Sequence, residues 1–231
     1  EKFFDAGSLT PEERVKGLKA GLRTGDLMPV FCGAGGSMQG IDLLLDGLAD
    51  YLPPAGETAG ETATNAKGEA VELKVDADGP LAAIVFKTIA DPFVGKLSYF
   101  KVISGKLSAD SQAVNARTGE TERISKVMIV RGGKQEDTPS VAAGDIGAVA
   151  KLAGVITGDT LTSQANPLTL APIVFPAACL SMAVKPKNKG DEDKIVAGLN
   201  RLAEEDPTIR YEQNHETHEL ILSGLGEQHL D

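Results

Sequence analysis

The hydrophobic pattern of the first fifty residues changes from helical to extended and back to helical spacing. Thr10 and Glu13 form a capping box at the start of a predicted amphipathic helix that continues until Gly25. The apolar run 28–32 ends in glycines, which predicts a buried strand followed by a loop, and 41–51 again has helical spacing. Residues 1–52 therefore indicate a helix–strand–helix piece of an α/β domain, since one βα unit does not cover its own sheet.

The middle of the chain has an entirely different pattern. Over 80–165, short runs rich in β-branched residues are separated by Gly- and Asp-containing turn signals, with no helical period. Strands at such close spacing predict an antiparallel barrel or sandwich. We expect strands over 81–89, 97–103, 112–117, 123–131 and 146–152. The expected core residues are Ile84, Phe86, Phe100, Val102, Val127, Ile129, Ile146 and Val149.

Two further segments complete the organisation. Residues 53–79 are rich in Gly, Ala, Thr and Glu, which predicts an inter-domain linker with a short strand near 69–74. The segment 172–231 predicts a strand over 178–184, a helix over 191–206, strands over 208–213 and 219–223, and the approach to another helix. This is the beginning of a split βαβ unit. Both ends of the chain are therefore expected to be cut from something larger.

Composition places the chain among ordinary globular proteins. Of 231 residues, 42% are hydrophobic and 24% charged, which argues against intrinsic disorder. No run reaches the roughly 18 apolar residues of a membrane helix, and no signal-like segment is present. Cys32 and Cys179 are too few and too far apart for a disulfide framework or a structural zinc site, which favours a reducing cytoplasm.

Charge is distributed unevenly along the chain. The net charge is -10, but residues 80–165 carry ten basic and eight acidic side chains. An acidic protein is repelled by nucleic acid at long range, so any phosphate contact is expected in this middle third. The alternative is chance scatter over a solvated surface. Aromatic content of 4% without Trp argues against base-stacking platforms.

Several motifs occur in an order and spacing that resemble bacterial elongation factor G. Those resembling its second domain are 80–87, 90–97, 104–107, 143–149 and 157–161. Those resembling its third domain are 202–208 and 223–230. The resemblance implies a multi-domain fold: a translation-factor β-barrel over 80–165, flanked by an α/β remnant of a GTPase domain over 1–52 and a truncated α+β ferredoxin-like domain over 172–231.

The resemblance also implies a function. Intact members hydrolyse GTP while moving tRNA and mRNA through the ribosome, using GTP/GDP and magnesium. The chain has no phosphate-binding loop pattern, so we expect no cofactor in this segment, which would supply docking and inter-domain coupling. Expected partners are small-subunit ribosomal RNA and protein and the remaining GTPase and C-terminal domains, with no membrane, as a cytoplasmic monomer. The alternative is a non-translocating paralogue resembling the tetracycline ribosome-protection proteins.

Candidate site residues follow from the same resemblance. Gly33, Ala34 and Gly35 occupy the loop whose backbone contacts the guanine in the family, although the usual Ser and Ala are replaced and extra glycines loosen the loop. Lys101, Lys106 and Lys126 are candidates for RNA phosphate contacts, with ordinary solubilising lysines as the alternative.

One departure from the family concerns the hairpin 117–123. Glu120 and Glu122 stand where the family often has basic residues, so we expect this hairpin to contribute little to RNA binding. No nucleophile and base have the spacing of a catalytic set. His215 and His218 are better explained as a solvated turn than as a metal site. The resemblance makes His229 a helix-start residue at an inter-domain surface.

Overall fold

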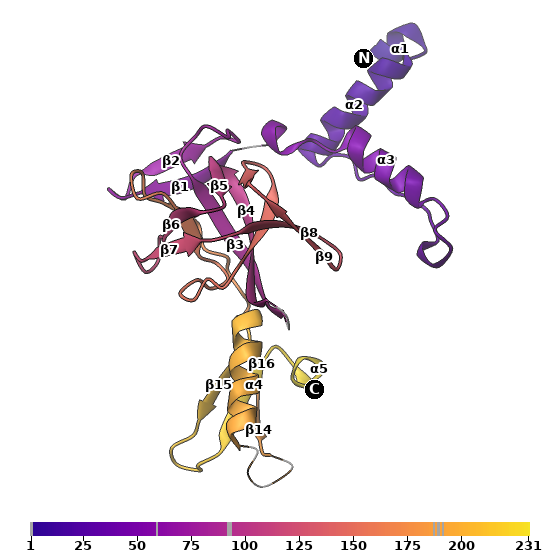
Figure 1. The fold of residues 1–231 in the computed structure, drawn as a ribbon. Coiled ribbons are helices and arrows are strands. Elements are labelled where there is room, and N and C mark those ends of the chain that lie inside the picture. Colours follow the sequence, from indigo (N-terminus) through magenta and orange to yellow (C-terminus); the bar gives the residue numbers. More distant parts are fainter. Residues whose placement is uncertain (1, 59, 92–93, 187, 189, 191) are drawn as a thin grey trace. The chain divides into compact units, whose positions relative to one another are not determined.

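The computed structural model describes all residues except 1, 59, 92–93, 187, 189 and 191 (Figure 1). The chain divides into two compact units, residues 1–59 and residues 60–231, and each is described by itself. No helix in the described part of the chain has both the length and the apolar character required to span a membrane.

The first unit is built from helices. Thr10 Oγ1 accepts a hydrogen bond from the Glu13 amide, and the Glu13 carboxylate accepts one from the Thr10 amide, which confirms the capping box. The helix ends at Gly25 in the left-handed conformation, as predicted. The helices are α1 (Lys2–Ala6), α2 (Pro11–Thr24) and α3 (Ile41–Tyr51), with 3₁₀ turns η1 (Gly35–Ser37) and η2 (Ala55–Glu57).

The strand predicted over 28–32 is not formed. These residues are extended, but no neighbouring strand pairs with them among the described residues of this unit. Phe31 instead lies against α3, where its ring fills the space that a side chain on Gly47 would occupy. Val15 and Leu18 of α2 stay 37% and 43% exposed, since no sheet among residues 2–58 covers them. An apolar run becomes a strand only where a partner strand satisfies its backbone groups.

A curled antiparallel sheet makes up most of the second unit (Figure 1). Its strand order is β7-β6-β12-β3-β4-β11-β8-β9, and β10 and β5 form a separate two-stranded ribbon. The strands are β3 (Ala82–Asp91), β4 (Gly95–Ser104), β5 (Lys106–Ser108), β6 (Ser111–Asn115), β7 (Thr121–Ile124), β8 (Val127–Arg131), β9 (Lys134–Thr138), β10 (Ser140–Ala142), β11 (Ile146–Ala150) and β12 (Thr160–Thr162). The one strand expected over 123–131 is therefore divided between β7 and β8.

The barrel interior contains most of the predicted core. Phe100, Val102, Val127 and Val149 are fully buried, and Ile129 packs against them. Ile84 is half-buried but packs on the outer side of the sheet, in a second cluster. Phe86 and Ile146 are wrong as core residues: they are 36% and 49% exposed.

The physical reason lies in the strand register. Ala83 and Val85 of β3 lie in the barrel interior, so ordinary strand alternation places Ile84 and Phe86 on the outer face, and the bulge of β3 comes only after Val85. Ile146 pairs with Lys101 on the outer face. Both strands carry apolar residues on both faces, so the sequence does not show which face is interior, and a prediction that is one residue out of phase selects the wrong face.

The expected linker over 53–79 contains structure that the sequence did not predict in full. β1 (Glu61–Asn65) and β2 (Ala70–Leu73) form a hairpin, and β13 (Leu168–Leu170) pairs with β1. The short strand expected near 69–74 corresponds to β2. Leu73, Leu168 and Leu170 are buried against Ala82 and Ile103 on the outer face of the barrel. Pairing between segments so far apart in the chain leaves no signal in the local sequence.

This packing predicts that the barrel needs its flanking sheet. We expect residues 60–171 to give a dispersed amide NMR spectrum and to unfold at higher urea concentration than 80–165 alone. Removing the flanking sheet exposes the outer cluster, and burial of each leucine contributes about 1.5–3 kcal/mol. Equal urea midpoints for the two spans would contradict this expectation.

The segment after the barrel folds as a sheet with helices. β14 (Leu180–Val184), β15 (Arg210–Gln213) and β16 (Leu220–Gly224) form an antiparallel sheet in the order β14-β16-β15. Between β14 and β15 runs α4 (Glu192–Glu205), and α5 (Glu227–Leu230) follows β16. The β-α-β-β order and the final helix agree with the prediction. The predicted start of the first helix, residue 191, lies outside the described residues.

Candidate functional site

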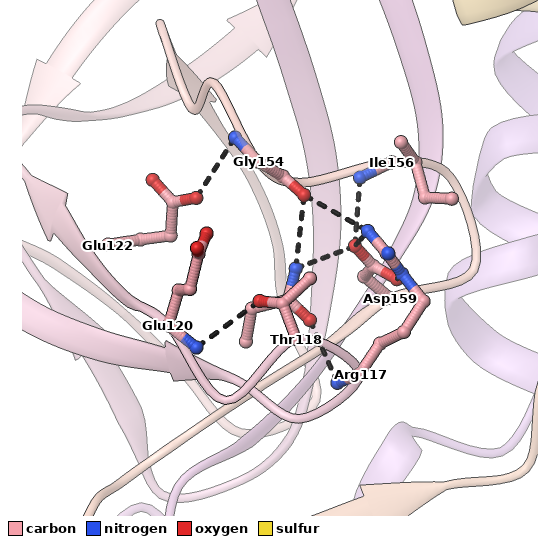
Figure 2. Close-up of polar contacts among 8 residues, drawn as sticks. Arg117, Thr118, Glu120, Glu122, Gly154, Ile156 and Asp159 are labelled. Atoms are coloured by element: carbon pink, nitrogen blue, oxygen red, sulfur yellow. Dashed lines mark hydrogen bonds and ion pairs between the residues drawn. The ribbon is translucent and has the colours of Figure 1, made fainter.

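An ion pair between a half-exposed arginine and a buried aspartate joins two loops at one end of the barrel (Figure 2). Arg117, which follows β6, donates from Nε to Asp159 Oδ1 at 2.7 Å and from Nη2 to Asp159 Oδ2 at 3.0 Å. The Asp159 side chain is 3% exposed, whereas that of Arg117 is 49% exposed. Arg117 Nη2 also donates to the Gly154 carbonyl at 3.0 Å. A two-pronged guanidinium–carboxylate pair therefore fixes the 115–120 turn to the 154–159 loop.

Other donors complete the environment of the Asp159 carboxylate. Oδ2 accepts hydrogen bonds from Asn115 Nδ2 at 2.7 Å and from the Ile156 amide at 2.9 Å. Burial by itself raises the pKa of Asp159, but the hydrogen bonds from Arg117, Ile156 and Asn115 outweigh it and hold the pKa below its ordinary value. Asp159 is therefore an ionised group in the folded barrel at neutral pH.

The two acidic residues of the same hairpin, Glu120 and Glu122, both lie beside Gly154 of the 154–159 loop. Glu122 Oε1 accepts a hydrogen bond from the Gly154 amide at 3.1 Å (Figure 2). The Glu120 carboxylate lies close to the same glycine. The hydrogen bond from Arg117 to Asp159 raises the pKa of Arg117, and the negative charge of Glu120 raises it slightly further. A carboxylate at position 122 thus has a structural role that a basic residue would not fill.

The three lysine candidates lie on different parts of the barrel surface. Lys101 is half-buried on the outer face of β4, paired across the sheet with Ile84 and Ile146. Lys106 is exposed on β5. Lys126, between β7 and β8, donates to Asp137 Oδ2 at 2.6 Å, which raises the pKa of Lys126. Lys126 is thus already engaged, whereas Lys101 and Lys106 have no ion-pair partner among the described residues.

The Gly33–Ala34–Gly35 loop is closed by backbone bonds. The Ala34 amide donates to the Gln39 carbonyl at 2.9 Å, and the Ala34 carbonyl accepts from the Ser37 amide at 3.2 Å. The Ala34 amide is therefore occupied, and a contact to a guanine base through this loop requires one of the glycine amides instead. The role of these three residues stays a prediction.

The histidines occupy two settings. His215 and His218 lie in the turn between β15 and β16, where Asn214 Oδ1 accepts from the amides of Glu216 and Thr217. In the described part of the chain, no three His, Cys, Asp or Glu side chains are grouped as metal ligands.

His229 of α5 has a defined tautomer. Its Nδ1 accepts a hydrogen bond from the Leu225 amide at 3.0 Å, so in the neutral ring the proton lies on Nε2, which is 3.0 Å from Asp206 Oδ2. Partial burial by itself raises the pKa of Asp206, but bonds from Thr208 and His229 lower it overall. His229 therefore ties the start of α5 to the end of α4.

Comparison with known proteins identifies both folded segments of the second unit. The family described as "Elongation factor G domain 2" matches residues 80–164, and "Elongation Factor G, domain III" matches residues 175–231. A crystal structure of a protein from Thermus thermophilus superimposes with a TM-score of 0.76 at 27% identity. The alignment covers the whole of this chain and 32% of the other, so the chain spans about a third of that protein's length.

An antiparallel translation-factor barrel followed by a β-α-β-β segment defines a translation elongation factor. The chain belongs to the elongation factor G family, and it matches that family's second and third domains.

Sequence reasoning missed the contacts that hold the barrel loops together. Thr157–Leu161 is one of the motifs that resemble the family, but its sequence does not indicate that Asp159 pairs with Arg117, 42 residues earlier. The residues around Asp159, Thr157-Gly158-Asp159-Thr160, have the pattern of an ordinary polar turn, so the local sequence contains no signal of a buried ion pair. Which of the barrel's basic residues pairs with Asp159 was decided only by the fold.

Proposed function

We propose that the intact protein is a ribosome-binding translational GTPase that promotes GTP-dependent movement of tRNA and mRNA. The observation that carries the proposal is the consecutive match to two elongation factor G domains over 80–164 and 175–231. In this proposal the barrel is a rigid platform that docks on the small subunit, and the third domain relays the state of the GTPase domain. Rigid-body domain motion of this kind is a common basis of switching.

In this proposal GTP is bound by the intact protein and not by the present chain alone. GTP and magnesium would be held by a phosphate-binding loop, and the present sequence has no Gly-x-x-x-x-Gly-Lys-Ser/Thr pattern. The sequence does not supply a phosphate-binding loop, and the loop over 33–35 would contribute a backbone contact to the base through a glycine amide, since the Ala34 amide is already bonded. We therefore assign no step of hydrolysis to residues of this chain.

A non-translocating paralogue, similar to the ribosome-protection proteins, is the second candidate. Its support is the acidic hairpin: the Glu122 carboxylate is bonded to the Gly154 amide and belongs to the barrel's own structure. A hairpin specialised in this way does not present the basic surface usual in the family. The activity of the intact protein in a translocation assay distinguishes the two candidates.

The chain by itself is expected not to bind GTP. Backbone amides near Gly33 cannot replace a loop that surrounds the phosphates. Calorimetric titration with GTP and magnesium should give no heat above the heat of dilution. A micromolar dissociation constant would contradict this expectation.

Docking is tested directly by co-sedimentation of the chain with purified ribosomal subunits. We expect binding to small subunits at low salt, with weaker binding to large subunits. Contacts between cations and phosphates release counterions, so the affinity should fall steeply as salt is raised. Failure to sediment with small subunits at any salt concentration would overturn the docking proposal.

A further inference from the structure

The imidazole of His229 lies between two parts of the segment after the barrel and is bonded to both. Its Nδ1 accepts a hydrogen bond from the Leu225 amide at 3.0 Å, in the turn that connects β16 to α5. Its Nε2 lies 3.0 Å from Oδ2 of Asp206, the residue that follows α4. The ring accepts on one side and donates on the other, and only the neutral ring with its proton on Nε2 can do both.

The two groups that the ring contacts are themselves held by further hydrogen bonds. Oδ1 of Asp206 accepts from the Thr208 amide at 2.8 Å and from the Thr208 hydroxyl at 2.5 Å. The carbonyl of Leu225 accepts from the Cys179 thiol at 2.8 Å. The carboxylate and the peptide group are therefore fixed in the orientation that suits the neutral ring.

The end of β16 leaves room for this contact. A Cβ atom on Gly224 would lie 2.8 Å from Nδ1 of His229 and 2.7 Å from Cδ2 of Leu230. Both distances are too short for real contacts, so the imidazole and the leucine side chain lie directly against the strand backbone. These two side chains hold α5 against β16.

Asp206 is the charged group that faces the ring. The other titratable side chains on the elements around it are Glu204 and Glu205 at the end of α4, Glu227 and Asp231 of the α5 segment, and the Cys179 thiol before β14. In the part of the chain that the structure describes, no hydrogen bond or ion pair joins any of these five to the imidazole. The His229 side chain is 24% exposed, so its ring exchanges protons with water.

We propose that protonation of His229 releases the Leu225 turn and α5 from the end of β16, while the ring stays bound to Asp206. The added proton lies on Nδ1, so the ring N–H and the Leu225 N–H face each other and their hydrogen bond is lost. The contact with Asp206 becomes an ion pair and is strengthened by the charge. Histidine side chains as a class change charge between about pH 5 and pH 8, which is the range in which this contact acts as a switch.

This inference is independent of nucleotide and ribosome binding, because it concerns only the packing of residues 206–230. NMR of the whole chain between pH 8 and pH 5 tests it. The imidazole ¹⁵N shifts should show a proton on Nε2 alone at pH 8 and on both nitrogens at pH 5. The protection of the Leu225 amide against hydrogen exchange, corrected for the intrinsic rate at each pH, should fall about tenfold, which corresponds to the loss of one hydrogen bond. Both changes should have the same midpoint.

Two variants make the result specific. His229→Gln removes the titrating ring and should abolish the pH dependence of Leu225 protection. The matched control His215→Gln removes an exposed imidazole from the turn between β15 and β16 and should leave that dependence unchanged. A proton on Nδ1 at pH 8, constant Leu225 protection in the wild type, or a transition that persists in His229→Gln would each overturn the proposal. The ring and amide titrations of the wild type decide the question even if His229→Gln does not fold.

Discussion

Replacing Asp159 with Ala is expected to lower the free energy of unfolding of the barrel by about 3 kcal/mol. The change leaves Arg117 without its carboxylate and removes the acceptor of the Asn115 side chain and the Ile156 amide. Breaking a buried ion pair by removal of one partner costs about 3–5 kcal/mol. The lower end applies because the Arg117 side chain is half exposed and regains water. Urea denaturation followed by barrel amide signals measures the loss.

An exposed ion pair in the same barrel provides the control. The Asp137 side chain is 58% exposed and pairs with Lys126, whose side chain is 69% exposed. The variant Asp137→Ala should lower the free energy of unfolding far less than Asp159→Ala, because exposed ion pairs contribute little to stability. Similar losses for the two aspartates would show that the 117–159 network does not hold the barrel loops together.

The effect of Asp159 should also depend on pH in a defined direction. Its pKa is lower in the folded barrel than in the unfolded chain, so its contribution to stability is fully present above the unfolded pKa of about 3.9. The contribution is lost as the pH falls through the lower, native pKa. The difference in the free energy of unfolding between the wild type and Asp159→Asn, measured by urea denaturation, should therefore be constant above about pH 5 and become smaller below about pH 4.

Reversing the charge of Lys101, Lys106 and Lys126 to Glu is expected to weaken small-subunit binding strongly and to flatten its dependence on salt. Each phosphate contact contributes roughly 0.7–0.9 log units of affinity per decade of salt, so loss of three contacts flattens the slope by about 2 log units per decade. Co-sedimentation across a salt series gives both quantities. An unchanged slope would mean that the barrel docks through its backbone or through protein contacts.

Two controls make this result specific. Reversal of Lys67, Lys74 and Lys87 changes the net charge equally and should leave the salt slope nearer that of the wild type. Because Lys126 is bonded to Asp137, a version with Lys126→Gln separates loss of an RNA contact from repulsion within the β8–β9 hairpin. Glu120→Ala should leave binding unchanged or tighter, because it removes a carboxylate from the same domain.

Local sequence signals determined much of this protein. The capping box at Thr10, the helix ending at Gly25 and the β-α-β-β order after residue 172 all depend on residues close together in the chain, and the structure confirms them. The barrel was predicted from the spacing of β-branched runs and turn signals. Colinear motifs identified the family, because their order and spacing survive at low overall identity.

Tertiary structure alone decided the features that depend on distant residues. The fold placed Val85 inside the barrel and Phe86 outside, and the run at 28–32 has no partner strand among the described residues of its unit. The pairing of β1 with β13 and of Arg117 with Asp159 joins residues that the sequence separates by many positions. Hydrophobic periodicity reports which face of an element is buried, but it does not report which element covers it. Partners of strands and of buried charges are chosen by the folded chain.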